Sequence, residues 1–155
     1  MCLEVIMKRI LVLFISSMFA VCCFCQVRTI EQAKEEMKGK LIEMCKVINQ
    51  QTPIRVDEDL TLNSIMFTDW QLISSYCFSV SIDGLSSENI KELRDVAKKM
   101  LIENIKAIYV NGGDWGFTME QFKSMLKDCN LRFLYGFYDI NGKLMFNLRI
   151  DYNDF

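Results

Sequence analysis

From residue 30 onward, hydrophobic residues recur every three or four positions, which is the spacing of an amphipathic helix. The run follows Thr29-Ile-Glu-Gln32, a capping-box pattern in which the two polar side chains bond the first free backbone N–H groups. It ends near Gln50, ahead of Pro53, because the residue before a proline avoids the helical conformation. The pattern predicts a long helix over about residues 29–50.

Two further segments have the same helical spacing. The first begins at Ser86 or Ser87 and ends at Asn111-Gly112, since glycine accepts the left-handed conformation that ends many helices. The second follows Thr118-Met-Glu-Gln121, another capping-box pattern, and ends near Asp128. We therefore expect a second long helix and a short third one.

Between the first two helices the spacing changes to two residues, which is the period of a half-buried strand. Apolar residues alternate with serines and a cysteine from Tyr76 to Ile82, and Asp83-Gly84 closes the run. Residues 60–67 predict a partner strand, with Thr68-Asp-Trp-Gln71 as the connecting turn. This region is expected to form a β-hairpin.

The last section predicts a second hairpin. Asn141-Gly142 is the favoured pair for a two-residue type I′ turn. Folding the chain around it pairs Phe137 with Phe146, Tyr135 with Leu148 and Phe133 with Ile150, so that these six side chains share one face. The opposite face then receives Arg132, Leu134, Gly136, Tyr138, Met145, Asn147 and Arg149.

These elements predict an α+β fold in the order α-β-β-α-α-β-β. Two hairpins of this kind join most simply in one antiparallel sheet, with the two long amphipathic helices and the short helix against its apolar face. A single hairpin would be only marginally stable alone. The pattern leaves the strand order open.

Two stretches resemble a group of small exported bacterial α+β proteins of unknown function. One is Asn49-Gln-Gln-Thr-Pro53-Ile-Arg-Val-Asp57-Glu-Asp-Leu-Thr-Leu62-Asn-Ser-Ile65, and the other is the turn Tyr138-Asp-Ile-Asn-Gly142. In that group a proline follows the first helix, an aspartate follows the proline, and a leucine opens the first strand. A threonine three residues after the aspartate is common there, whereas this chain has Leu60 with Thr61 next to it. The resemblance implies an α+β envelope protein and supplies no activity.

The segment before the first helix has the layout of a secretory signal peptide. Apolar residues run from Ile10 to Cys25 with Lys8 and Arg9 ahead of them, and small residues close the run. The run is shorter than the roughly 20 apolar residues that a membrane-spanning helix needs. We expect residues 1–25 to be a signal peptide and residues 26–155 to form a single domain.

The cysteines at positions 22, 23 and 25 leave two other fates of this segment open. A lipoprotein needs a small residue immediately before its modified cysteine, and only Cys23, preceded by Cys22, is tolerable in that respect. The segment could also stay uncleaved as an anchor. In each case the protein is exported, to the periplasm or beyond the cell, with a membrane anchor in the latter two.

Composition excludes some classes of function. The chain has 18 Lys and Arg against 20 Asp and Glu, for a net charge of −2, with the signs mixed along the helices. Without a basic stripe we expect no nucleic-acid partner, and without a polybasic amphipathic face we expect no membrane insertion after signal cleavage. The chain has no histidine, the usual general base at neutral pH.

No catalytic, metal or cofactor residues are assigned, and the sequence leans against an enzyme. Ser124 and Lys127 have the spacing of a Ser-Lys pair but fall on the polar side of the short helix. Cys77 lacks a neighbouring cation that would activate a thiol. The alternating oxygens of residues 57, 59, 61 and 63 lack the glycine and glutamate of a calcium loop.

Three cysteines follow residue 25, namely Cys45, Cys77 and Cys129. Export implies an oxidising compartment, yet an odd number leaves at least one thiol unpaired within a single chain. Cys45 and Cys129 could meet in a disulfide, and burial as small apolar side chains is the equal alternative.

Aromatic residues in two loops are the candidate partner-binding residues. The loop Asn111-Gly-Gly-Asp-Trp-Gly-Phe117 carries Asp114, Trp115 and Phe117, and Trp70 lies in the first hairpin turn. Large aromatic side chains anchor many interfaces, although they also pack inward between helices.

We therefore favour a non-enzymatic binding module in the bacterial cell envelope, with a protein or an envelope component as its partner. The alternative is a small-ligand carrier for a lipid or a peptide. In that case the ligand would lie on the aromatic face of the sheet, formed by Tyr76, Phe78, Phe133, Tyr135 and Phe137.

Overall fold

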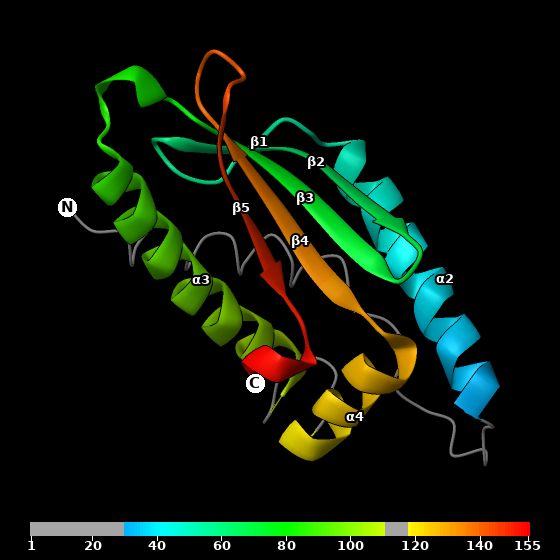
Figure 1. Ribbon diagram of the computed structural model, residues 1–155. Coiled ribbons are helices and arrows are strands. Elements are labelled where there is room, and N and C mark those ends of the chain that lie inside the picture. The colour runs from blue at the N-terminus through cyan, green and yellow to red at the C-terminus, as the bar shows by residue number, and fades with distance from the viewer. Residues whose placement is uncertain (1–29, 111–117) are drawn as a thin grey trace.

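The computed structural model describes residues 30–110 and 118–155, which form helices on a five-stranded sheet (Figure 1). The helices are α2 (Ile30–Asn49), α3 (Ser87–Tyr109) and α4 (Met119–Cys129); the strands are β1 (Ile54–Arg55), β2 (Leu60–Thr68), β3 (Gln71–Phe78), β4 (Arg132–Tyr138) and β5 (Leu144–Ile150). Two short 3-10 helices, η1 (Ile82–Gly84) and η2 (Tyr152–Asp154), complete the described part. None of its helices is both long enough and apolar enough to cross a membrane.

The α+β class and the order of the elements are confirmed. The strands lie in the order β1-β2-β3-β4-β5, so the two strands of each predicted hairpin are neighbours in the sheet. The two-residue strand β1 lies at one edge of the sheet and was not predicted from the pattern. Every strand pair is antiparallel except β3 with β4, which is parallel. Parallel neighbours require a long crossover connection, and the segment holding α3 and α4 provides it.

The helices cover the apolar face of the sheet. Leu41, Met44, Cys45 and Ile48 are the buried residues of α2, and Leu101, Ile105 and Tyr109 are those of α3. These residues form one core cluster with the buried residues of the strands, which places α2 and α3 on the same side of the sheet. The strands show the matching alternation, with a buried residue at every second position of β4. The capping box predicted at Thr118 is confirmed at the start of α4, and Ser86 closes another at the start of α3. The one predicted at Thr29 lies outside the described residues.

The register of the second hairpin is confirmed, but its turn is not of the expected type. Phe133 pairs with Ile150, Tyr135 with Leu148 and Phe137 with Phe146. The turn spans residues 139–143, with the N–H of Gly142 bonded to the carbonyl of Asp139 and only Gly142 at positive φ. A type I′ turn needs positive φ at both central residues, so the prediction of that turn was wrong.

The expected register survives because a bulge compensates for the longer turn. Tyr138 pairs with Leu144 and Phe137 with Phe146, so Met145 is an extra residue on β5. Met145 was expected on the exposed face and is instead 8 % exposed within the core. The first hairpin also differs slightly, since β3 ends at Phe78 and leaves Val80 and Ile82 outside the strand.

Asn49, the last residue of α2, completes the outer edge of β2. Its side-chain amide donates to the carbonyl of Ile65 over 2.6 Å and accepts from the N–H of Ile65 over 2.9 Å. β1 pairs only with Thr61 and Leu62 of β2 and does not reach Ile65. On that side of β2, the amide of Asn49 supplies the hydrogen-bond partners of the Ile65 backbone. The amide therefore ties the end of α2 to the sheet in the manner of a neighbouring strand.

Phe137 lies at the centre of the aromatic packing under the helices. Its ring stacks on Phe146 at 4.7 Å between centroids, on Tyr76 at 5.3 Å and on Phe78 at 5.9 Å. These contacts join β3, β4 and β5, and the side chain is 4 % exposed.

We expect Phe137→Ala to lower the free energy of unfolding by about 3–5 kcal/mol, because it removes a large buried ring and leaves a cavity. Ile140→Ala is the control, since Ile140 is 60 % exposed and should change stability by no more than about 0.5 kcal/mol. Urea unfolding of the purified proteins measures both values. A loss below about 1 kcal/mol for Phe137→Ala would contradict the central position of this ring.

Candidate binding site

The turn between β2 and β3 has a left-handed backbone at both of its central residues. Thr68 pairs with Gln71, and between them Asp69 has φ 48° and Trp70 has φ 55°. A bulky residue is uncommon in this region because its Cβ approaches the following carbonyl oxygen. The two-residue primed turn expected at Asn141-Gly142 thus occurs at Asp-Trp.

Trp70 is half-buried, and its surroundings hold it in place. Its ring meets the ring of Phe67 edge-on, with the centroids 5.8 Å apart. Its carbonyl accepts a 2.9 Å hydrogen bond from the N–H of Arg132, at the start of β4. Part of the ring therefore packs against the core, and part remains available at this end of the sheet.

The other three predicted binding residues, Asp114, Trp115 and Phe117, lie outside the described residues. Val110, the last described residue before them, is buried, and Thr118 opens α4 beyond them.

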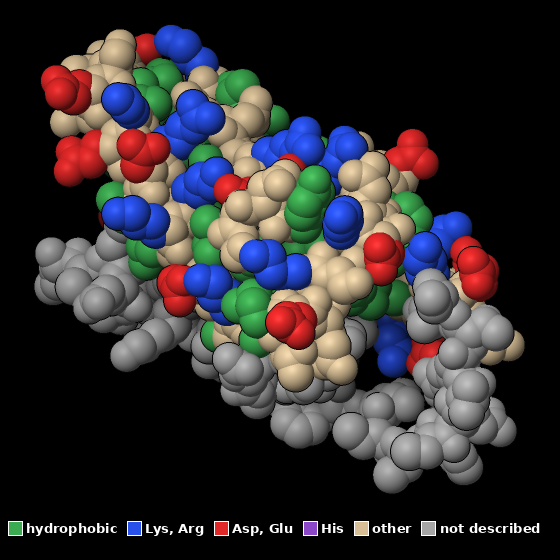
Figure 2. Space-filling view, turned by 60° about the horizontal axis from the view of Figure 1, so that its bottom comes forward, with side chains coloured by type: hydrophobic (Ala, Val, Ile, Leu, Met, Phe, Trp, Pro, Cys, Tyr) green, Lys and Arg blue, Asp and Glu red, His purple; other side chains and the backbone are tan. Residues whose placement is uncertain are grey.

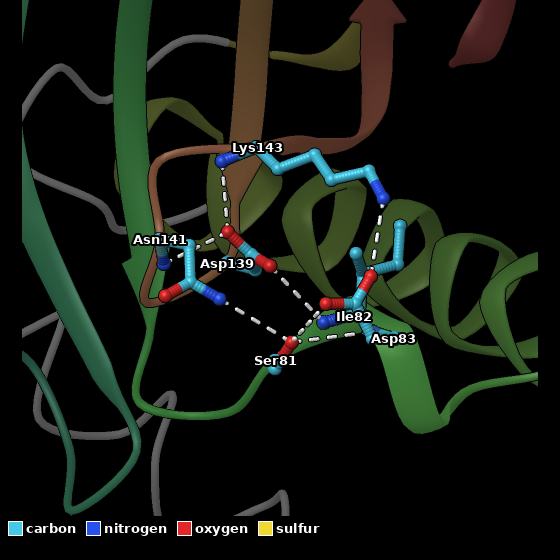
Figure 3. Close-up of polar contacts among 6 residues, drawn as sticks. All are labelled: Ser81, Ile82, Asp83, Asp139, Asn141 and Lys143. Atoms are coloured by element: carbon cyan, nitrogen blue, oxygen red, sulfur yellow. Dashed lines mark hydrogen bonds and ion pairs between the residues drawn. The ribbon is translucent and has the colours of Figure 1, made fainter.

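At the opposite end of the sheet, one buried carboxylate joins two loops (Figure 3). Asp139 is fully buried, and one of its oxygens accepts from the N–H groups of Asn141 at 2.9 Å and Lys143 at 2.8 Å. The other oxygen accepts from the N–H of Ile82 at 3.1 Å, in the segment that follows β3. Asp139 thereby holds the β4–β5 turn against η1.

Weaker polar contacts surround this carboxylate. The side chain of Asn141 donates to the hydroxyl of Ser81 over 3.4 Å, and Lys143 forms a 3.1 Å ion pair with Asp83 (Figure 3). Figure 3 shows both pairs flanking Asp139, between the turn and η1. The thiol of Cys77 donates to the carbonyl of Asp139 over 3.2 Å. This end of the sheet is thus built as a structural joint.

Burial raises the pKa of Asp139, but the hydrogen bonds from the N–H groups of Lys143, Ile82 and Asn141 outweigh it. The pKa therefore lies below the ordinary value for an aspartate, because three donors favour the charged carboxylate. Sequence reasoning singled out this turn but not its aspartate. Asp139 lies two residues before Asn141, and an aspartate side chain often accepts from the backbone N–H two residues further along the chain. This spacing could have identified Asp139 as a turn-stabilising residue.

The cysteines are free thiols in the described part of the chain, so of the two alternatives for Cys45 and Cys129 the structure has burial and not a disulfide. Burial raises the pKa of Cys45 to about 11. Burial also raises the pKa of Cys129, with Lys34 acting against it. Within the described ranges, no three Cys, Asp or Glu side chains are grouped so as to hold a metal ion.

The remaining candidates have local partners. The hydroxyl of Ser124 donates to the carboxylate of Asp128 over 3.1 Å, one turn along α4. The carboxylate of Asp57 accepts from the N–H of Asp59, whose own carboxylate accepts from the hydroxyl of Ser79 over 2.5 Å. The Ser124 contact lies within α4, the contact between Asp57 and Asp59 lies in the loop between β1 and β2, and the Ser79 contact joins this loop to the segment after β3.

The aromatic face of the sheet, on which a carrier would bind its ligand, is filled by its own rings. Tyr76, Phe133, Tyr135 and Phe137 are each no more than 9 % exposed. A cavity of about 40 Å³ remains between these strands and α3. Pockets for drug-sized ligands measure about 300–1,000 Å³, so the carrier alternative is not favoured.

Charged side chains are spread over the molecular surface. The face in Figure 2 carries Lys and Arg among Asp, Glu and small hydrophobic patches. Such a mixture does not single out a partner of one charge.

Comparisons with known proteins found structural likeness only. No protein-family model matches the chain, and no curated protein matches it. A protein of Pseudomonas aeruginosa, solved as a candidate secreted protein, has a TM-score of 0.48 and 14% identity, over 82% of this chain and 97% of its own. The pilotin EpsS of the Vibrio vulnificus type 2 secretion system has a TM-score of 0.47 and 10% identity, over 77% of this chain and 92% of its own.

The type II secretion system pilotin AspS of Vibrio cholerae has a TM-score of 0.43 and 11% identity, over 79% of this chain and 99% of its own. Because all three TM-scores lie below 0.5 and all identities below 25%, these likenesses carry no weight for the function of this chain.

We expect Asp139→Asn to destabilise the protein at neutral pH, because an amide group would direct N–H atoms at backbone donors. A lowered folded pKa contributes stability that is complete above the unfolded value of about 4 and is lost as the pH falls through the folded value. The variant should therefore have a lower Tm at pH 7 and a shallower fall in Tm below about pH 4.

Thermal unfolding between neutral and acidic pH measures this difference. Asp83→Asn is the control, since it removes an exposed ion pair and keeps an amide oxygen that can accept from the Ser81 hydroxyl. It should leave both the Tm and its pH dependence nearly unchanged. Parallel pH profiles for wild type and Asp139→Asn would contradict the stabilising role of the charged carboxylate.

Proposed function

We propose that this chain is an exported, non-enzymatic binding protein of the bacterial cell envelope, and that Trp70 is part of its contact surface. The observation that carries the proposal is the left-handed backbone of Trp70 at the end of the sheet, with its ring half-buried. Backbone strain of this kind concentrates at functional sites.

The cost of this conformation is the physical argument. A non-glycine residue in the left-handed region costs about 1–2 kcal/mol, and Asn-Gly would form the same turn without that cost. The edge-on contact with Phe67 recovers about 0.5–1.5 kcal/mol beyond the area that the ring buries, so packing offsets the strain of the turn. A tryptophan held rigidly at a tip is, however, the kind of anchor that carries much of the energy of an interface.

The loop of residues 111–117 is a second part of the proposed surface. Trp115 and Phe117 are aromatic residues among three glycines, and Asp114 adds a charge. The proposal for this loop rests on its sequence.

Export is supported by the N-terminal sequence. Lys8 and Arg9 precede an apolar run that ends in small residues, as in secretory signal peptides. The solved structures named above include a candidate secreted protein and secretion-system pilotins. The proposal rests on the residues of this chain and not on these likenesses.

The N-terminus of the protein from its native cells tests export. We expect mass spectrometry of the envelope fraction to find a chain that begins at Gln26, because small residues precede this position. A lipid-modified N-terminal Cys23 would change the mode of anchoring but keep the location. An intact N-terminus on protein recovered from the cytosol would disprove export.

Cross-linking in native cells tests the contact surface. A photo-reactive residue at Thr68, an exposed position two residues from Trp70, should form an adduct with the partner, which mass spectrometry identifies. The same residue at Ile140 is the control, because it is exposed at the opposite end of the sheet.

Binding of the identified partner then tests the side chains. Trp70→Gly removes the ring, so affinity should fall about 30-fold or more, as for an interface anchor, measured at a temperature at which circular dichroism shows both proteins to be folded. Asp69→Gly relieves the turn without removing the ring and should bind like wild type.

Asp114→Lys with Trp115→Ala tests the loop in the same assay. Full affinity in Trp70→Gly would exclude Trp70, and full affinity in the loop variant would exclude the loop.

A further inference from the structure

A small cavity lies between α3 and the middle of the sheet. It has a volume of about 40 Å³, and its walls come from β3, β4 and the second half of α3. The apolar lining residues are Leu72, Leu101, Ile105, Ile108 and Phe133. The polar lining residues are Ser74, Tyr76, Asn104, Tyr109 and Tyr135.

Three residues of the sheet that carry hydroxyl groups line this cavity, and these hydroxyls have no hydrogen-bond partner among the described residues. Ser74 is 2 % exposed, Tyr76 is 3 % exposed and Tyr135 is 9 % exposed. Leaving a buried polar group unpaired costs about 1–3 kcal/mol for each group. Three such costs in one place are rare in native proteins, whose buried polar groups nearly always have a protein or water partner.

These residues also lie close to one another, since Ser74 pairs with Tyr135 across β3 and β4 and the ring centroids of Tyr76 and Tyr135 are 6.4 Å apart. Burial raises the pKa of Tyr135 well above its ordinary value, and Tyr76 and Tyr109 raise it further. Burial raises the pKa of Tyr109 to about 12, with a smaller effect of Cys45. Because Tyr109 belongs to α3 and the other two belong to the sheet, polar groups converge on the cavity from both layers.

We propose that this cavity is a binding site for ordered water, which bridges the hydroxyls of Ser74, Tyr76 and Tyr135. A water molecule needs about 10–15 Å³ of accessible space and two to four polar partners, so the cavity holds a few waters at most. A benzene-sized ligand needs about 150 Å³, which is well above the observed volume. The site therefore fits water and no larger ligand.

The bound water is part of the joint between α3 and the sheet. It satisfies hydroxyls on β3 and β4 beneath a helix whose own polar residues line the same space. This role is independent of the proposed function, since Trp70 does not line the cavity.

The sign of the stability change in Tyr→Phe variants tests the proposal. If water bridges the hydroxyls, Tyr76→Phe and Tyr135→Phe each remove one partner of that water, and each should lower the folding equilibrium constant about fivefold. The double variant should lose less than the product of the two single losses, because both act on one hydrated cluster. Tyr138→Phe, on the other face of the sheet, is the matched control and should leave the constant unchanged.

Unchanged or increased stability in both single variants would overturn the proposal, because it would mean that the hydroxyls are unsolvated. Oxygen-17 magnetic relaxation dispersion of the full chain provides a second readout. Wild type should contain more long-lived internal water than the double variant, and equal amounts in the two proteins would also overturn the proposal.

Discussion

The parallel pairing of β3 with β4 is the contact that makes one sheet of two hairpins. It places Gln71 beside Arg132 and Cys77 beside Tyr138, so that both strands start at one end of the sheet and finish at the other. The Trp70 turn consequently meets the start of β4, where Arg132 donates to the carbonyl of Trp70. At the far end, the segment after β3 meets the turn after β4, and Asp139 joins them. An antiparallel pairing of the hairpins would separate both sets of partners.

The core above this pairing is aromatic and nearly full. Stacked rings of Tyr76, Phe137 and Phe146 cross the three strands, and Tyr109 of α3 stacks on Phe122 of α4 at 5.3 Å. A face filled in this way stabilises the fold and has no room for a lipid or a peptide. The tyrosines bring hydroxyl groups into the interior, which the small cavity beneath α3 accommodates.

The two ends of the sheet differ in what they do for the molecule. Asp139 concentrates hydrogen bonds on one buried carboxylate, and its position is explained by the stability of two loops. Trp70 occupies a strained turn that Asn-Gly would form without strain, and its ring is only half-buried, against Phe67. The stability of the fold explains the position of Asp139 but not the backbone strain at Trp70, and for this reason we place the partner at the Trp70 end of the sheet.

The sequence by itself determined the helices, both hairpins and the face that each strand buries. Phe133, Tyr135 and Phe137 alternate with smaller or polar residues, and a one-residue slip would expose all three, so burial alone selects the register. It did not determine the turns, because a three-residue turn plus a bulge at Met145 gives the same register as a two-residue turn. Only the tertiary structure decided the parallel junction, the left-handed backbone of Trp70 and the partners of Asn49 and Asp139. The parallel junction, the Asn49–Ile65 contact and the Asp139–Ile82 contact depend on residues far apart in the chain, whereas a hydrophobic period reports only on neighbours along it. The same period carries no information on the dihedral angles of a turn.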